Sequence, residues 1–304
     1  DTTGVRLEPD GNRFGTVRAD GARVSPSRWW DPYGPNRLKG DVPIAGRRHF
    51  LVTTVLLDSL YTEDRADSDT DPLRVSNSTA LVSLEYFVGQ TVFRPKTFSL
   101  RATALARTVV DVQGDADRVE DFSIGETFVE VLLADHGRTS YDSTSLRAGN
   151  QAFNADVLGL LLNDTLPAAR VFSEWSSNRG NATLFYGRPR EKDAGAALPV
   201  EDRALESDIA AANLTVGDAF VPGFNLTLLG AYDDDRRTAG LRTRVAWGGL
   251  AGSGHLGRFV TAPAVYLAAG SSNIGGDRQN VLAPLVVVDL ARPADLWNPR
   301  LTLL

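Results

Sequence analysis

The sequence contains no cysteine among its 304 residues. Without thiols the chain can form no disulfide bond, no thiolate zinc site, no iron–sulfur cluster and no cysteine nucleophile. Methionine is absent as well, so the chain starts at Asp1 without an initiator residue. We therefore expect a processed or excised product, and removal of a signal peptide fits this start.

Positive charge is present almost only as arginine. The chain has 32 lysines and arginines against 38 acidic residues, a net charge of −6, and its only lysines are Lys39, Lys96 and Lys192. Nucleic-acid binding normally needs clustered positive charge, and no basic patch stands out along the sequence. We therefore predict no nucleic-acid partner.

Long apolar runs are also missing. The longest, such as residues 158–162, fall far short of the roughly 18 to 20 residues that a membrane-spanning helix requires. Hydrophobic residues still make up 42% of the chain. The length suits two ordinary domains or one large β-barrel, so the placement of the apolar residues has to decide.

Apolar residues alternate with polar ones along much of the chain. In residues 97–112, Phe98 and Leu100 alternate with Ser99 and Arg101. Successive side chains of a strand point to opposite faces, so this pattern predicts a strand with one apolar and one polar face. The same alternation recurs in residues 82–89, 145–149, 224–228 and 241–247.

The connectors between these segments alternate between short turns and long, mostly acidic loops. We count about 13 strand-like segments from Arg47 onward, most about 10 to 16 residues long, against the 5 to 6 typical of soluble sheets. This combination is typical of an all-β, antiparallel transmembrane β-barrel with tight periplasmic turns and longer outer loops. A soluble β-sandwich or propeller is the alternative, because it also has alternating strands and turns.

The polar faces of the predicted strands mix both signs of charge, as an aqueous barrel lumen would. The solvated face of a soluble sheet is the alternative interpretation. On the first interpretation, nine residues are predicted to line a pore: Glu85, Arg101, Arg107, Glu126, Glu130, Arg147, Arg242, Arg244 and Arg258.

Residues 1–46 lack the alternation and are rich in glycine and proline. We predict an irregular N-terminal segment, periplasmic or at the barrel mouth, followed by barrel strands over residues 47–304. Its aromatic residues Trp29, Trp30 and Tyr33 are candidate anchors at the membrane interface, where amphipathic rings are favoured, and Trp247 is a fourth. Packing into the barrel mouth is the alternative for the three N-terminal rings.

Several motifs follow one another in a recognisable order. The most specific is S-L-R-A-G-N-Q-A-F-N-A-D at residues 145–156. The others are residues 29–33 with 38–43, V-F-R-P-K at 92–96, E-T-F-V-E-V-L-L-A-D at 126–135, Y-D at 141–142, F-Y at 185–186 with E-K-D at 191–193, and G-H-L-G-R at 254–258. Together they cover most of the chain and resemble a family of large, mostly uncharacterised bacterial outer-membrane β-barrel proteins. The resemblance implies a barrel in the outer membrane and carries over no catalytic residue.

The C-terminus departs from that family. Its members look longer, and bacterial barrels generally end in an aromatic residue, whereas this chain stops at Leu304. An open sheet edge is not tolerated in hydrocarbon, because its unpaired N–H and C=O groups cost several kcal/mol each. We therefore expect the C-terminal strands to be missing from this chain, or another chain to close the barrel.

Neither catalytic nor metal-binding motifs stand out. The three histidines are scattered, and neither a G-x-S-x-G elbow nor a phosphate-binding loop occurs. Asp67, Asp69 and Asp71 begin like a calcium loop, but Pro72 and Ser78 stand where an EF-hand needs glycine and glutamate. These aspartates are weak calcium candidates, as are Asp115 with Asp117 and residues 233–235. We predict no enzymatic activity and no cofactor.

Two hypotheses on function follow. The first is a porin-like passive channel for small polar solutes in the bacterial outer membrane, with the lipid bilayer as its partner, because opposing charges across a pore can order permeants without a deep binding well. The second is a plugged structural or interaction barrel whose acidic loops or Trp29 segment dock a partner protein in a cell-surface assembly.

Overall fold

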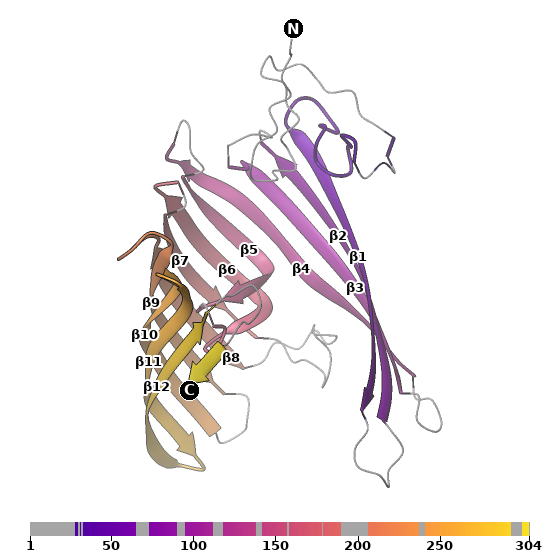
Figure 1. Cartoon of the computed structure of the whole chain (residues 1–304). Coiled ribbons are helices and arrows are strands. Elements are labelled where there is room, and N and C mark those ends of the chain that lie inside the picture. Colours follow the sequence, from indigo (N-terminus) through magenta and orange to yellow (C-terminus); the bar gives the residue numbers. More distant parts are fainter. Residues whose placement is uncertain are drawn as a thin grey trace. The chain divides into compact units, whose positions relative to one another are not determined.

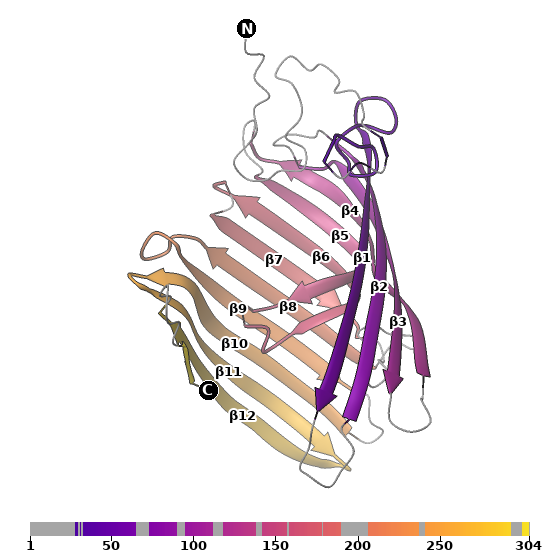
Figure 2. The same cartoon turned by 45° about the vertical axis from the view of Figure 1, so that its right-hand side comes forward.

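The computed structural model is built entirely of β-strands in the part of the chain that it describes (Figures 1 and 2). The described residues are 28–29, 31, 33–64, 73–89, 95–111, 118–137, 142–156, 158–177, 179–189, 206–236, 241–292 and 300–303. The strands are β1 His49–Asp64, β2 Leu73–Val88, β3 Phe98–Asp111, β4 Arg118–Asp135, β5 Ser143–Asn154, β6 Asn163–Trp175, β7 Gly180–Gly187, β8 Ser207–Val216, β9 Phe224–Asp235, β10 Leu241–Leu256, β11 Phe259–Ile274, β12 Asp277–Ala291 and β13 Arg300–Leu303.

The strands follow one another in the sheet in sequence order, from β1 to β13. Every strand pair whose register is described is antiparallel, as expected for strands joined by direct hairpin connections. The all-β antiparallel class and the expected number of strand segments are therefore confirmed. Within the described residues the sheet is open, with β1 and β13 as its edges. No helix in these ranges has the length and apolar character needed to cross a membrane.

The chain divides into two compact units, and the division falls within β4. Unit 1 comprises residues 1–129 and 192–202, and unit 2 comprises residues 130–191 and 203–304. The sequence pattern, which indicated a single boundary at residue 46, did not indicate this division. Each unit is described by itself below.

Unit 1 is built on the long strands β1, β2 and β3. On β2 the side chains of Val82 and Leu84 are exposed, whereas those of Glu85 and Phe87 are buried. The segment before β1 has no strand of its own in its described residues, and it meets the sheet through an isolated bridge between Lys39 and Val52. Most of the N-terminal segment, residues 1–27 with 30 and 32, lies outside the described residues, so its expected irregular structure stays a prediction.

Unit 2 is a two-faced sheet of strands β5 to β12. We call one side the buried face, which carries a continuous apolar cluster: Phe153, Leu166, Phe185, Leu229, Tyr266 and Val287, with Ala155, Ala211, Ala251 and Ala264. The other side, the exposed face, carries large apolar side chains that touch no packed core: Leu146, Leu184, Leu228, Leu250, Val265 and Leu267. Apolar residues thus occupy both faces of unit 2.

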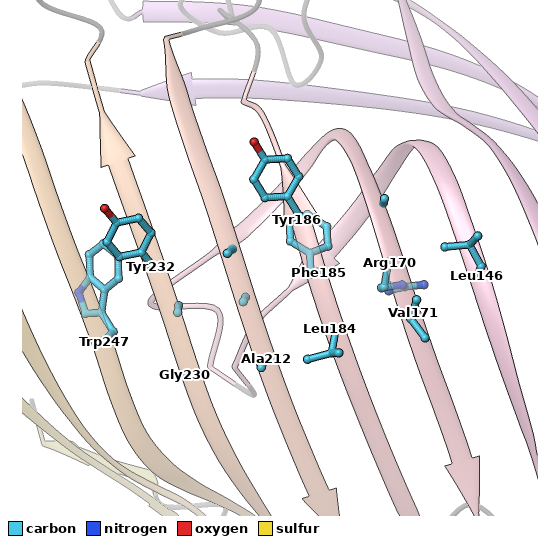
Figure 3. Close-up of a pocket in the computed structure, with 14 residues that line it drawn as sticks. Leu146, Arg170, Val171, Leu184, Phe185, Tyr186, Ala212, Gly230, Tyr232 and Trp247 are labelled. Carbon is cyan, nitrogen blue, oxygen red and sulfur yellow. The ribbon is translucent and has the colours of Figure 1, made fainter.

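The connection between β5 and β6 explains why one apolar face is buried. Asp156 accepts hydrogen bonds from the backbone N–H groups of Leu158, Leu160 and Leu161, at 2.9, 3.2 and 2.8 Å, so this short segment folds around one carboxylate. Leu158, Leu161 and Leu162 then pack against the apolar cluster of the buried face. In Figure 3 the ribbons of β5 and β6 arch over and run across the strands that follow.

Candidate functional site

Unit 1 contains a network of four charged groups, of which only Glu85 is buried, here called the unit 1 charged cluster: Glu85, Lys96, Arg101 and Glu126. Arg101 lies directly opposite Glu85 in the register of β2 and β3. Its guanidinium donates to Glu85 Oε2 at 2.8 Å and to Glu126 Oε2 at 2.7 Å, and Lys96 Nζ also donates to Glu85. Two cations therefore balance two carboxylates, which permits Glu85 to be only 8% exposed.

Aromatic rings lie beside both cations of this cluster. Lys96 Nζ lies 4.8 Å from the centre of the Phe87 ring, and the Arg101 guanidinium carbon lies 5.3 Å from that of Phe128. Both rings are buried, so the charges are held between apolar planes and away from most of the solvent. Further along β3, Arg107 donates its Nε–H to Asn77 Oδ1 at 3.0 Å.

Unit 2 has a charged cluster of its own on the buried face, formed by Glu130, Arg147 and Arg170, here called the unit 2 charged cluster. Arg147 donates two hydrogen bonds to Glu130 Oε2, at 2.9 and 2.6 Å. Arg170 lies opposite Arg147 in the register, and both guanidiniums lie near the Phe172 ring, at 4.8 and 5.4 Å respectively. The two positively charged guanidinium groups therefore both contact the same aromatic ring.

Two members of these clusters were missed by the sequence analysis. Lys96 lies in the connection between β2 and β3, where no alternation could mark its direction. Arg170 lies in β6, within the run R-V-F-S-E at residues 170–174, in which Arg170, Phe172 and Glu174 occupy every second position. This alternation could have indicated that Arg170, Phe172 and Glu174 lie on one face of the strand.

The prediction that Arg242 and Arg244 share a face with Arg147 is wrong. Arg147 and Trp247 belong to one row of cross-strand partners. From β5 to β10 this row consists of Arg147, Arg170, Phe185, Ala211, Ala231 and Trp247. Trp247 therefore lies on the same face as Arg147, and Arg242 and Arg244 lie on the other. On the side of β10 opposite to Arg242 and Arg244, Val245 is only 6% exposed.

On the exposed face, Arg242 and Arg244 belong to a group at one end of the strands, here called the rim cluster: Arg188, Asp208, Asp234, Arg236, Arg242 and Arg244. Asp234 accepts two hydrogen bonds from Arg242, at 2.9 and 2.6 Å, and lies 3.5 Å from Arg244 Nε. Asp208 accepts from Arg188 Nε at 2.6 Å, from Tyr186 OH at 2.8 Å and from Arg236.

The remaining predicted site residues lie apart from these clusters. Arg258 is exposed in the turn between β10 and β11. Trp29 and Tyr33 are 73% and 95% exposed, so these two rings are not packed against unit 1. Trp30 lies outside the described residues. Trp247, predicted as an interface anchor, lies on the buried face instead.

The acidic residues considered for calcium fall into two sets. Asp67, Asp69, Asp71, Asp115 and Asp117 lie outside the described residues. Within residues 233–235, Asp234 is held by arginines, and Asp233 accepts a hydrogen bond from the Ser207 hydroxyl at 2.8 Å. Across the described ranges, no three acidic or histidine side chains come together in a way that could hold a metal ion.

No protein-family model and no curated protein matches the chain. The similarity to outer-membrane barrel proteins seen in the motifs thus stays a prediction. What the geometry offers is two sets of ion-paired side chains beside aromatic rings and one exposed apolar sheet face that ends in a charged rim.

Proposed function

We propose that the chain is part of an outer-membrane β-barrel that gives small polar solutes a passive route. The observation that carries this proposal is the exposed face of unit 2. Leu184 and Leu228 on that face are 65% and 52% exposed, and they have many large apolar neighbours. A water-soluble protein rarely exposes so continuous an apolar surface, whereas a bilayer would cover it.

The composition of β9 on the exposed face supports a membrane as the covering medium. The exposed-face positions run from Leu226 through Leu228 to Tyr232 without a charge, and Asp234 follows as the first charge. Outer-membrane barrels carry an outward-facing apolar band with aromatic residues at its borders. Tyr232 occupies such a border position.

The connections between the unit 2 strands differ widely in length. Two-residue turns occur at both ends of the strands, at residues 257–258 between β10 and β11 and at residues 275–276 between β11 and β12. The longest connection, residues 188–206 between β7 and β8, lies at the same end as residues 275–276. Short periplasmic turns and longer outer loops are typical of outer-membrane barrels. On this proposal the rim cluster lies on the outer side.

The charged clusters support a passive route rather than a binding protein. In each cluster the carboxylates are already paired with arginine or lysine. A passing ion is therefore exposed to the electric field of fixed charges but finds no unpaired carboxylate to bind. Solutes can then be sorted by charge without being held.

Planar-bilayer conductance of the complete barrel that contains this chain tests this proposal. We expect channels whose preference between K⁺ and Cl⁻ shifts in the double variant Arg101→Gln with Arg147→Gln, because two cations leave the route. Arg242→Gln is the matched control, since Arg242 lies on the exposed face of unit 2, and should keep the wild-type preference. Absence of any conductance, or equal shifts in both variants, would contradict the proposal.

The β5–β6 connection favours a second candidate, a plugged barrel that serves as an interaction protein. Leu158, Leu161 and Leu162 cover part of the buried face of unit 2 with apolar side chains, which a solute route does not need. A closed interior with exposed Trp29 and Tyr33 would suit a docking role. Stoichiometric co-purification of one partner protein, lost on Trp29→Ala and with no conductance, would favour this candidate over the channel.

A further inference from the structure

The exposed face of unit 2 is hollowed by a groove of about 600 Å³ (Figure 3). Small residues form its floor: Ala169, Ala210, Ala212 and Gly230. Leu184 and Tyr186 rise on one side of this floor and Tyr232 on the other. A side chain built on Gly230 would meet no atom within 4 Å, so the floor there faces open space. The groove is mostly apolar and extends across the strands, from Leu146 on β5 to Trp247 on β10, and its apolar lining suits an acyl chain.

The rim cluster lies beside the groove, two residues further along the same strands. In Figure 3 the hydroxyl groups of Tyr186 and Tyr232 point toward the same end of the strands. The Tyr186 hydroxyl donates to Asp208, a member of the rim cluster, at 2.8 Å. Two residues beyond Tyr232 on the same face, Asp234 meets Arg242 and Arg244. The apolar groove therefore leads directly to guanidinium groups.

The rim cluster carries more positive than negative charge. Its four arginines share two carboxylates, those of Asp208 and Asp234. The arginine side chains remain between 38% and 58% exposed, so part of each guanidinium-bearing side chain is accessible from outside the protein. Guanidinium groups bind phosphate oxygens through pairs of parallel N–H donors.

We propose that the groove and the rim cluster together bind one anionic, phosphate-bearing membrane lipid. One acyl chain lies along Ala210, Ala212 and Gly230, and the phosphate is held by Arg242 and Arg244. The surplus of guanidinium charge selects an anionic headgroup over a zwitterionic one. This inference rests on the proposed function, because it requires the exposed face of unit 2 to lie in a bilayer.

Native mass spectrometry of the full chain in dodecyl maltoside, titrated with dioleoylphosphatidylglycerol or dioleoylphosphatidylcholine, tests the proposal. We expect the phosphatidylglycerol adduct to form with about tenfold higher affinity than the phosphatidylcholine adduct, roughly the worth of one charge-assisted contact. The double variant Arg242→Gln with Arg244→Gln should lose this selectivity. Gly230→Leu, which fills the floor of the groove, should weaken both adducts.

The variant Asp234→Asn should change the affinity for phosphatidylglycerol in the opposite direction from the arginine variants. Removing that carboxylate leaves Arg242 and Arg244 without their shared acceptor, so phosphatidylglycerol should bind more tightly, by about threefold or more. A purely structural role for the rim cluster predicts the opposite, because both kinds of substitution would then loosen the same ion pairs.

Two control variants match the chemistry of the changes away from the site. Arg258→Gln removes an exposed arginine at the other end of β10, and Val265→Leu alters an exposed-face residue outside the groove. Both should bind phosphatidylglycerol as the wild type does. Equal binding of the two lipids, or an equal loss in Arg258→Gln and in the double arginine variant, would overturn the inference.

Failure of this inference is distinguishable from failure of the proposed function. A chain that inserts into vesicles and conducts, but binds both lipids alike, contradicts only the lipid site. A chain that inserts into vesicles of neither lipid contradicts the proposed function and the lipid site with it.

Discussion

Strands β5 and β10 belong to the same sheet of unit 2, and both alternate arginine with apolar residues, yet they orient the arginines in opposite directions. On β5, Arg147 lies on the buried face, where it pairs with Glu130. On β10, Arg242 and Arg244 lie on the exposed face, where they meet Asp234. Alternation therefore separates two faces but does not say which of them is buried.

The two strands also end differently, and this accounts for much of the contrast. After β5 the chain turns back over the buried face and is held around Asp156. After β10 it passes through the short turn of residues 257–258 into β11. The returning segment places leucines against the apolar cluster of the buried face, and on the same face of β10 Val245 is only 6% exposed.

The largest effect is expected where β5 turns back. Asp156→Ala leaves three backbone N–H groups without their acceptor, and should lower the free energy of unfolding by about 4 kcal/mol. Asp218→Ala is the matched control, since Asp218 accepts one backbone hydrogen bond, from Gly223, in an exposed turn. Urea denaturation of the detergent-folded chain measures both, and the control should lose less than about 1 kcal/mol. Equal losses would show that the carboxylate of Asp156 does not hold the segment.

A smaller effect is expected from the arginine of β5. Arg147→Gln leaves the Glu130 carboxylate, only 14% exposed, without its cation, and should cost about 3 kcal/mol of unfolding free energy. Removing both charges, with Glu130→Gln added, should restore part of that loss. The same substitution at Arg242 should leave stability unchanged within error. A loss at Arg242 as large as at Arg147 would erase the contrast between the two strands.

The smallest effect concerns which residues contact lipid. Because the chain has no cysteine, single cysteines introduced at Ala148 on β5 and at Ala246 on β10 can be labelled without background. Both positions lie on the exposed face, so in lipid vesicles a water-soluble maleimide should react with each about tenfold more slowly than with Thr243→Cys on the opposite face. The sequence pattern predicts fast labelling at position 246. Fast labelling at position 246 would show that the face of β10 that carries Ala246 is exposed to water and not to lipid.

Several features could be inferred from residue types and spacing. Period-2 patterning predicted the strands, because a strand presents alternate side chains to its two faces wherever it is placed. Glu85, Arg101, Glu126, Glu130 and Arg147 lie on the side of their strands away from exposed apolar neighbours such as Leu84, Leu100 and Leu146, and their place in a pore lining stays a prediction. Arg170 was open to the same reasoning and was overlooked.

Other features could not be inferred from spacing. In the segment L-R-T-R-V-A-W of β10, leucine, valine and tryptophan alternate with arginine much as apolar residues do in a lipid-facing strand. Which face of this strand is buried depends on the rest of the sheet, whose strands lie far away in the sequence. Lys96 joins Glu85 only because the connection between β2 and β3 returns it to the end of the sheet.

By itself the sequence determined that this chain forms antiparallel strands with two unlike faces, because the direction of each side chain follows from local backbone geometry. Only the tertiary structure decided which face of β10 is buried and that arginines and tyrosines gather at the end of an apolar groove. Those outcomes depend on register and on the path of the β5–β6 connection, which join residues that no local pattern relates.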